Sequence, residues 1–248
     1  MITSSQNAQI KELRKLSQRK YLKERSVFPI EGVTMLREAL RSEVVPKEIY
    51  VSKSYAFDFE KEFNLPFSVV VDELMQSISS TVSGRELIAL VPKEKDHQIP
   101  EVPRGLYVYL QDVQDPGNVG TIIRSAEAFG LAGVCLSPDS AYIYNDKVVR
   151  SSMGSIFRMP HCVLCDDDVF EFKKKGYAIV TCAPRGGQSF STSWDGAFLI
   201  IGNESSGVSQ DMMERADGIL TIPMEGMVES LNAGVAASIA MFMLVGED

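Results

Sequence analysis

The sequence predicts an α/β protein with two domains: a smaller N-terminal α/β domain and a larger C-terminal domain built on a parallel sheet. Three observations predict this class. Strand-like apolar runs alternate with helix-like segments along the chain, and a stretch with three prolines at 92–103 interrupts the alternation. The strands after that stretch are almost continuously apolar, as in a sheet covered on both faces by helices. The predicted domains are 1–95 and 105–248, joined by a linker at 96–104.

The first domain begins with a basic segment, residues 6–25, in which Ile10, Leu13 and Leu16 recur at spacings of three. This spacing predicts one amphipathic helix. Strands are then predicted at 27–30, 48–51, 67–71 and 87–91, and helices at 33–41, at 55–63 and from residue 72.

The second domain continues the alternation. Strands are predicted at 106–110, 133–136, 162–164, 178–182, 198–201 and 219–222. Helices are predicted at 119–129, 167–175 and 230–245.

Composition and charge exclude several classes of protein. The 248 residues are 45% hydrophobic and 23% charged, which excludes a disordered chain and a collagen-like fibre. The net charge of −8 argues against a general coating protein for nucleic acid. However, residues 1–47 hold ten Lys or Arg against five Glu, and the remainder is strongly acidic. The basic segment is therefore either a solvated helix face or a local contact for an anionic polymer.

The four cysteines, Cys135, Cys162, Cys165 and Cys182, lie in apolar runs and indicate a reducing compartment. Cys162 and Cys165 form an isolated pair with no second pair beside it, so we expect no metal site. The polar N-terminus predicts no signal peptide, and the apolar run at 231–245 is too short for a bilayer span. These features predict a cytoplasmic protein.

Three loops interrupt apolar strands of the second domain, at 111–124, 202–207 and 222–236. Asn118 is a candidate N-cap for a helix beginning near Val119, and Ser230 is a candidate cap for the last helix. Gly202 follows a buried strand, where glycine permits close approach of a ligand. Ligands of open α/β sheets bind at such carboxyl ends, so we expect the three loops to converge.

Together the loops resemble the SpoU (TrmH-type) RNA ribose 2′-O-methyltransferases of the SPOUT superfamily. The resemblance is carried, in order, by residues 118–124 (NVGTIIR), 201–207 (IGNESSG) and 222–232 (IPMEGMVESLN). The N-terminal region resembles the substrate-binding domain of the same family, with Glu31-Gly32 after its first strand. One departure is Ala233-Gly234-Val235, where many members carry Val-Ser-Val.

The resemblance implies a SPOUT-type parallel sheet with a trefoil knot, S-adenosylmethionine as cofactor and a homodimer. It implies transfer of a methyl group to a ribose 2′-hydroxyl of RNA, with ribosomal RNA of the 23S type favoured over transfer RNA because of the separate N-terminal domain. The implied cofactor-binding residues are Thr181, Gly202, Ile222, Met224 and Leu231. The implied catalytic set is Arg124, Asn118, Glu204, Ser230 and Asn232.

The resemblance assigns activation of the hydroxyl to Arg124, yet an arginine is permanently protonated and makes a poor base. We therefore expect Arg124 to hold an RNA phosphate and to stabilise developing oxyanion charge, with the other four residues as positioning groups. The alternatives are a transfer-RNA ribose methyltransferase and a non-catalytic RNA-binding protein of the same fold. A nucleotide-binding oxidoreductase is disfavoured because no G-x-G-x-x-G is present.

Overall fold

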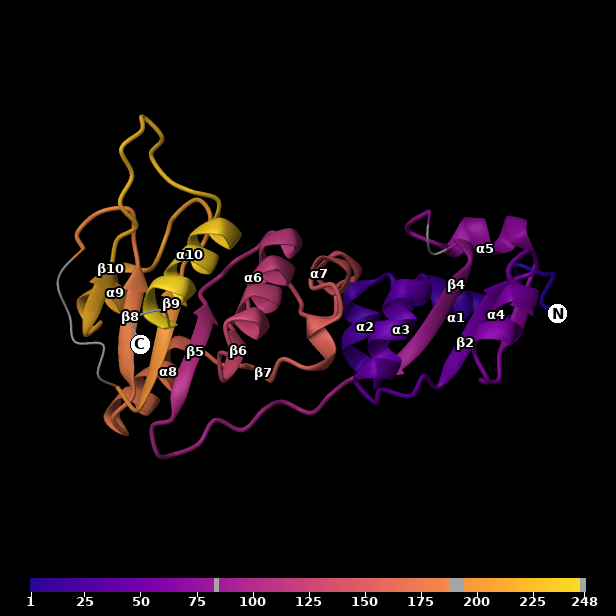
Figure 1. The fold of residues 1–248 in the computed structure, drawn as a ribbon, viewed down its shortest axis with the longest axis horizontal. Helices are drawn as coiled ribbons and strands as arrows, with labels where there is room; N and C mark the ends of the chain where they lie inside the picture. Colours follow the sequence, from indigo (N-terminus) through magenta and orange to yellow (C-terminus); the bar gives the residue numbers. More distant parts are fainter. Residues whose placement is uncertain (83–84, 188–193, 246–248) are drawn as a thin grey trace. The chain divides into compact units, whose positions relative to one another are not determined.

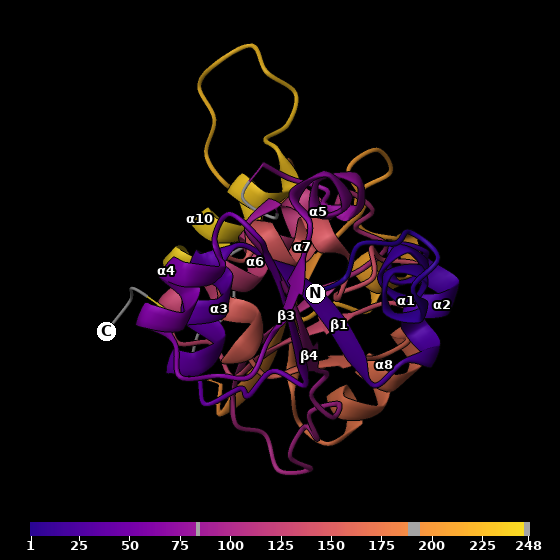
Figure 2. The same ribbon diagram turned by 90° about the vertical axis from the view of Figure 1, so that its right-hand side faces the viewer.

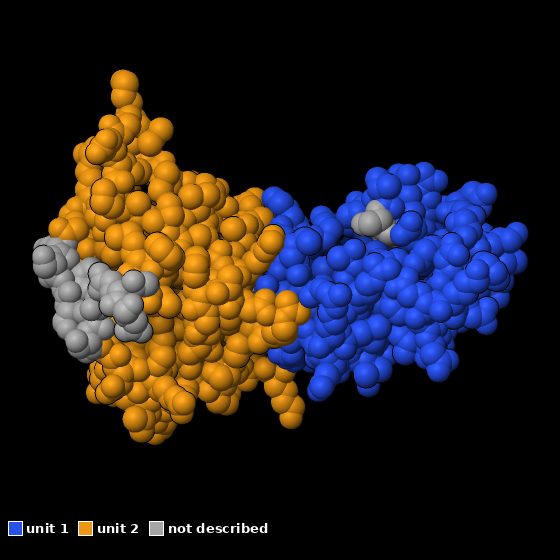
Figure 3. All heavy atoms as spheres, viewed as in Figure 1, with its two compact units in different colours: residues 1–94, 144–157 blue, residues 95–143, 158–248 orange. Residues whose placement is uncertain are grey.

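The computed structural model describes residues 1–82, 85–187 and 194–245. Two compact units divide the chain (Figures 1 and 3). The first contains residues 1–94 together with 144–157, and the second contains 95–143 and 158–248. Residues 246–248, within the predicted second domain, lie outside the described ranges.

The first unit is built on a four-stranded mixed sheet in the order β1-β4-β2-β3. Its strands are β1 (Val27–Glu31), β2 (Glu48–Ser52), β3 (Ser68–Val70) and β4 (Leu87–Pro92). Its helices are α1 (Ala8–Leu16), α2 (Arg19–Glu24), α3 (Val33–Arg41), α4 (Ala56–Glu62), α5 (Asp72–Ile78) and α7 (Asp146–Ser151). Figure 2 shows α1 and α2 on one side of these strands and α3 and α4 on the other.

The single basic helix predicted over 6–25 is wrong, because the segment forms two helices that break at Ser17 and Gln18. Ile10, Leu13 and Leu16 are buried as predicted, and Leu22 of α2 is buried as well. At 100° per residue, an unbroken helix directs Leu22 away from the face that carries Leu13. The break turns Leu22 towards the core, and the Ser17 hydroxyl donates to the Arg14 carbonyl at 2.8 Å.

Residues 144–157 belong to the first unit although they follow two strands of the second in sequence. The Phe28 ring of β1 lies 4.6 Å from the ring of Tyr144 and 6.2 Å from that of Phe157. All three rings are buried. The predicted second domain, 105–248, includes this segment, because helix α7 is too short for its apolar residues to form a recognisable period.

The second unit is built on a six-stranded, fully parallel sheet in the order β10-β8-β9-β5-β6-β7. Its strands are β5 (Gly105–Leu110), β6 (Gly133–Leu136), β7 (His161–Val163), β8 (Ala178–Cys182), β9 (Gly196–Ile201) and β10 (Gly218–Leu220). Its helices are α6 (Pro116–Ala128), α8 (Asp166–Lys174), α9 (Gln210–Glu214) and α10 (Ala233–Val245). The predicted parallel sheet is confirmed.

Helices cover both faces of this sheet. Tyr109, Phe198 and Ile200 pack on one face with Val169 and Phe170 of α8. Strand side chains alternate between faces, and α6 and α10 pack against each other over the opposite one. This double cover explains why the strands read as continuous apolar runs.

The cysteines of the described residues are free thiols. Cys162 is buried with its Sγ 3.4 Å from that of Cys135, whereas Cys165 is exposed at the start of α8. Within the described ranges no His, Cys, Asp and Glu side chains form a group suited to a metal ion. None of the described helices has the length and apolar character needed to cross a bilayer.

Candidate functional site

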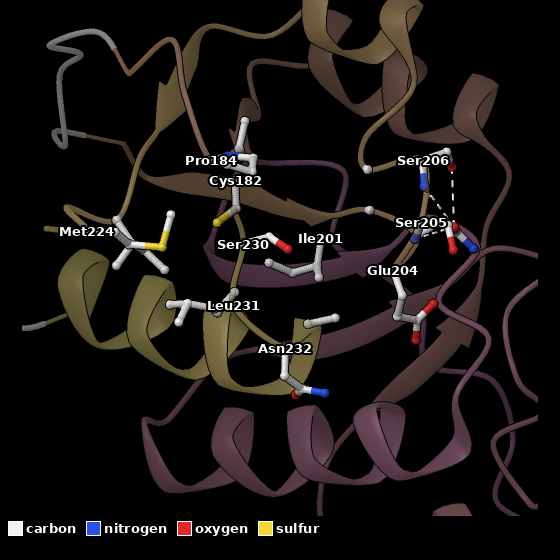
Figure 4. A pocket seen from close by; sticks show the side chains of 17 residues that line it. Cys182, Pro184, Ile201, Glu204, Ser205, Ser206, Met224, Ser230, Leu231 and Asn232 are labelled. Atoms are coloured by element: carbon white, nitrogen blue, oxygen red, sulfur yellow. Dashed lines mark hydrogen bonds between the residues drawn. The ribbon is translucent and has the colours of Figure 1, made fainter. Parts of the chain in front are cut away.

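The loops after β8, β9 and β10 meet at one pocket of about 510 Å³, at the carboxyl edge of the parallel sheet (Figure 4). Its lining comes from residues 182–184, 201–207, 222, 224, 230–233 and 236. Figure 4 shows Met224 and Glu204 on opposite sides of this pocket, with Leu231 and Asn232 at the start of α10. Two of the three loops singled out in the sequence thus line the pocket directly.

Four of the five predicted cofactor-binding residues line the pocket: Gly202, Ile222, Met224 and Leu231. Thr181 does not, because it is fully buried in β8 with its hydroxyl 3.4 Å from the Gly218 carbonyl. Its neighbour Cys182 lines the pocket in its place. Burial raises the pKa of the Cys182 thiol to about 11, so this side chain is uncharged at neutral pH.

Gly202 is required by the loop itself. A Cβ added at this position lies 2.2 Å from the backbone carbon of Gly207, which no side chain tolerates. Asn203 and Gly207 exchange two backbone hydrogen bonds, of 3.1 and 2.9 Å, that close the loop into a ring. Packing of the loop on itself therefore requires a glycine at this position. The close approach of a ligand to Gly202, expected from the sequence, stays a prediction.

A hydrogen-bonded chain joins three predicted catalytic residues from separate loops. The Asn232 side-chain amide donates to the Asn118 side-chain oxygen at 2.9 Å. Asn118 in turn donates from Nδ2 to the Glu204 carboxylate at 2.9 Å. The two contacts span 114 and 86 residues of sequence, so they tie the third and second loops to the first.

Glu204 is held as a carboxylate. Partial burial acts to raise its pKa, but the hydrogen bonds from Asn118 and from the backbone amides of Asp115 and Gln114 outweigh burial and lower the pKa. Donors to a carboxylate favour its charged form. The positive end of the α6 dipole, which begins at Pro116, acts in the same direction.

The two predicted helix caps are wrong. The N-cap of α6 is Asp115, whose side chain accepts from the Asn118 backbone amide at 3.0 Å, and Asn118 lies inside the first turn. Asn232 takes the place expected for Ser230, because its side-chain oxygen accepts from the amides of Gly234 and Val235 at 3.0 and 3.2 Å. The displaced Asn118 is thereby free to use its side chain in the network.

Helices α6 and α10 lie parallel and in register, so their N-termini meet beside the pocket. Ser125 contacts Ser238 at 2.7 Å between hydroxyl oxygens, and four residues further on the rings of Phe129 and Phe242 lie 6.0 Å apart. One turn earlier, a Cβ on Gly234 touches Thr121. This spacing of four is typical of helices packed along their i, i+4 ridges.

Arg124 and Ser230 stand apart from the network. Arg124 is exposed on α6 and, among the residues that the structure describes, makes no hydrogen bond or ion pair. Ser230 is exposed at the pocket, where its side chain is drawn in Figure 4. The free guanidinium of this side chain, in the second half of α6, is available to an anionic ligand.

Sequence reasoning missed the group that supports the loop at 202–209. Gln111 is buried, accepts from the Ser209 amide at 2.7 Å, and donates to Asp166 at 2.6 Å. Tyr109 also donates to Asp166, at 2.7 Å. The only signal in the sequence was a polar residue directly after the buried strand β5, because neither partner is near it in the chain.

Comparison with known families matches both units. Residues 105–242 match the SpoU rRNA Methylase family, and residues 7–89 match the MRM3-like substrate binding domain.

Relatives match the chain over most of its length. It is 32% identical over 250 residues to the 23S rRNA (guanosine(2553)-2′-O)-methyltransferase RlmP of Bacillus subtilis (strain 168), with 99% of each chain covered. It is 32% identical over 185 residues to a 23S rRNA (uridine(2479)-2′-O)-methyltransferase of Streptomyces viridochromogenes, covering 70% of this chain and 64% of that one. The crystal structure of the SpoU methyltransferase AviRb of that organism, in complex with AdoMet, superposes with a TM-score of 0.83 at 25% identity, covering 98% of both chains.

Proposed function

The chain belongs to the SpoU rRNA Methylase family, and from this premise we propose that it methylates the 2′-hydroxyl of a ribose in 23S ribosomal RNA, with S-adenosylmethionine as methyl donor. The observation that carries the proposal is the pocket where the second and third motif loops meet and are tied to the first. Relatives aligned over 250 and 185 residues are named as 23S rRNA 2′-O-methyltransferases, which favours ribosomal over transfer RNA.

The residues present fit the cofactor. Ile222, Met224 and Leu231 offer an apolar wall for a purine, and the volume of about 510 Å³ lies in the range of small-molecule sites. The Glu204 carboxylate supplies negative charge at the same pocket, which suits a cationic sulfonium. When bound, this cofactor supplies an electrophilic methyl group.

The chain's own residues orient the reactants. The transfer breaks the bond between sulfur and methyl, forms the bond between the ribose oxygen and methyl, and releases the hydroxyl proton to solvent. We propose that Arg124 holds the RNA phosphate and stabilises charge on the oxygen, because an arginine does not accept this proton. Asn118, Glu204 and Asn232 hold the three loops in place, and Ser230 faces the reacting groups.

Three further features belong to the proposal. We propose a homodimer, supported by α10, which is apolar on all sides yet leaves Val235 and Phe242 47% and 60% exposed. Family membership supports a trefoil knot. The long connection at 221–232, which leads from the edge strand β10 back to α10 beside α6, is consistent with one. A cytoplasmic location is supported by the ribosomal RNA substrates of the relatives.

Radiolabelled S-adenosylmethionine tests the activity. We expect incorporation into unmodified bacterial 23S rRNA at one ribose, mapped by resistance to alkaline cleavage, and none into transfer RNA. The nucleotides corresponding to those modified by the two relatives are the first to inspect. Incorporation into transfer RNA alone overturns the choice of substrate. Cofactor binding without transfer to any RNA overturns the enzymatic proposal and favours the RNA-binding alternative.

A further inference from the structure

The α1–α2 hairpin, residues 8–25, carries seven basic and two acidic side chains. Ile10, Leu13 and Leu16 of α1 and Leu22 of α2 face the core. The outer side of α1 presents Lys11, Arg14 and Lys15, all exposed. These three positions are related by i, i+3 and i, i+4 spacings and therefore form one stripe along the helix.

In the part of the chain that the structure describes, no carboxylate pairs with the positive charges of this stripe. Among the described residues, Lys11 and Lys20 form no ion pair, and Arg14 bonds only to the neutral hydroxyl of Ser77, at 3.2 Å. The Lys15 ammonium lies 5.6 Å from the centre of the neutral Tyr21 ring. These four exposed positive charges on one hairpin repel one another, and binding of an external anion offsets this repulsion.

The two carboxylates of the hairpin do not change this balance. Glu12 pairs with Arg25 at 2.7 Å, and the Arg25 guanidinium stacks 4.5 Å from the Tyr21 ring. Glu12 therefore neutralises Arg25. The second carboxylate of the hairpin, Glu24, is a single negative charge against the six remaining basic side chains.

We infer that this surface, Lys11, Arg14, Lys15 and Lys20 on α1 and α2, binds the phosphate backbone of the RNA substrate. The inference rests on the proposed function and adds the part of the first unit that contacts RNA. Charge complementarity carries it, because these exposed cations have no carboxylate partner among the described residues, whereas residues 48–248 together hold 28 acidic against 15 basic residues. Contacts of this kind supply affinity and orientation, and the site of methylation is selected elsewhere.

Lysine-to-glutamine variants test the surface with a matched control. The first protein carries Lys11→Gln, Lys15→Gln and Lys20→Gln. The control carries Lys47→Gln, Lys53→Gln and Lys61→Gln, three exposed lysines of the same unit that lie outside the hairpin. Both lose three positive charges, so a difference between them reports position and not net charge. The dissociation constant for unmodified 23S rRNA is measured from 50 to 400 mM salt, beside cofactor affinity and thermal unfolding.

For the hairpin variant we expect RNA affinity to fall by about 10- to 100-fold at 0.1 M salt, and the slope of log K against log salt to become shallower by about 2 to 3. Cofactor affinity and the melting temperature stay at the wild-type values, and methyl transfer at subsaturating RNA falls in proportion to RNA affinity. The control changes RNA affinity by less than about twofold.

If log K for RNA binding depends on log salt with the same slope in the wild type and the hairpin variant, the inference is overturned and the hairpin is a solvated helix face. The proposed function is unaffected by this result. Equal losses in both variants also overturn the inference, because the effect is then one of net charge. A wild-type chain that neither binds nor methylates the RNA refutes the proposed function itself, and the variants need not be compared.

Discussion

Glu204 joins the first and second loops, together with Asn203, whose side-chain amide donates to the Asp112 carbonyl at 2.8 Å. Its carboxylate accepts from two backbone amides at the start of α6 and from the Asn118 side chain. Asn118 accepts in turn from Asn232. The loops are thus tied together by hydrogen bonds, and those made to the Glu204 carboxylate are strongest when it is charged.

Replacing Glu204 by Gln tests this role through pH. The lowered pKa means that the carboxylate stabilises the folded state above the ordinary glutamate pKa of about 4.3, and that this contribution disappears as pH falls through the folded-state value. Exposure to water limits the contribution to about 1 kcal/mol, or about 2–4 °C in Tm at pH 7. Thermal unfolding of wild type and Glu204→Gln at pH 7 and pH 3.5 measures the difference, which should shrink at the lower pH. A constant difference contradicts the assignment.

Arg124→Ala separates binding from chemistry. Because Arg124 is exposed and bonds to no described residue, we expect unchanged stability and unchanged cofactor affinity. Methyl transfer should fall by about 10²- to 10³-fold, as when one group that stabilises developing charge is removed. Calorimetry with S-adenosylmethionine and single-turnover methylation measure the two quantities, with Arg124→Lys as the variant that keeps the charge. Lost cofactor binding with residual transfer refutes the role.

At this scale the sequence predicted which residues gather near the pocket better than it predicted what they do. The motif order identified Asn118, Glu204 and Asn232, but contacts across 86 and 114 residues do not follow from local spacing. The caps were misassigned because Asp115 and Asn118 are both good capping residues. Pro116, favourable at the first position of a helix, was the local signal for Asp115.

At the scale of elements, the parallel pair α6 and α10 connects the pocket to a surface. Ser125–Ser238 and Phe129–Phe242 contacts hold the register, and the outer side of α10 remains apolar. A polar surface is the usual outcome for an exposed helix, so this side favours cover by a second copy of the chain.

Phe242→Lys tests the proposed dimer. Phe242 is 60% exposed, so a charge there should leave the monomer folded and drive sedimentation towards the monomeric mass. Phe57→Lys is the matched control, because Phe57 is 66% exposed on α4. Sedimentation velocity of both variants decides the matter: a wild type that is already monomeric, or a Phe242 variant that remains dimeric, contradicts the assignment of this helix.

The long helices and strands were predicted correctly, because a single tertiary contact does not override an apolar pattern that extends over many residues. Strand β9 and helix α3 were predicted close to their observed bounds. The short helices α7 and α9 were not predicted, since five or six residues carry too little periodicity. The break between α1 and α2 was missed because it is decided by burial of Leu22, a tertiary effect.

At the scale of the whole molecule, the chain passes between its two units three times: near residue 94, near 143 and near 157. The aromatic cluster of the first unit depends on these passages, because Phe28 packs against Tyr144 and Phe157. The predicted limits at 95 and 105 did not include this exchange.

Phe157→Ala should therefore destabilise the first unit, although residue 157 follows six strands in the chain. Truncating a buried phenylalanine costs about 3–5 kcal/mol. Hydrogen exchange should accelerate in β1 and β4, and Phe57→Ala, at an exposed site, should leave exchange unchanged. Acceleration confined to β5 and β6 contradicts the division into units.

The position of residues 144–157 in the chain also determines when the core of the first unit can be completed during translation. Domains usually fold from the N-terminus as they leave the ribosome. Here the first 94 residues are synthesised before Tyr144 and Phe157. The ring of Phe28 therefore lacks these two partners while about 50 further residues are added, at roughly 5–20 residues per second. The nascent N-terminal unit completes its core only after β5 and β6 have been translated, so the ring of Phe28 lacks part of its cover during those seconds.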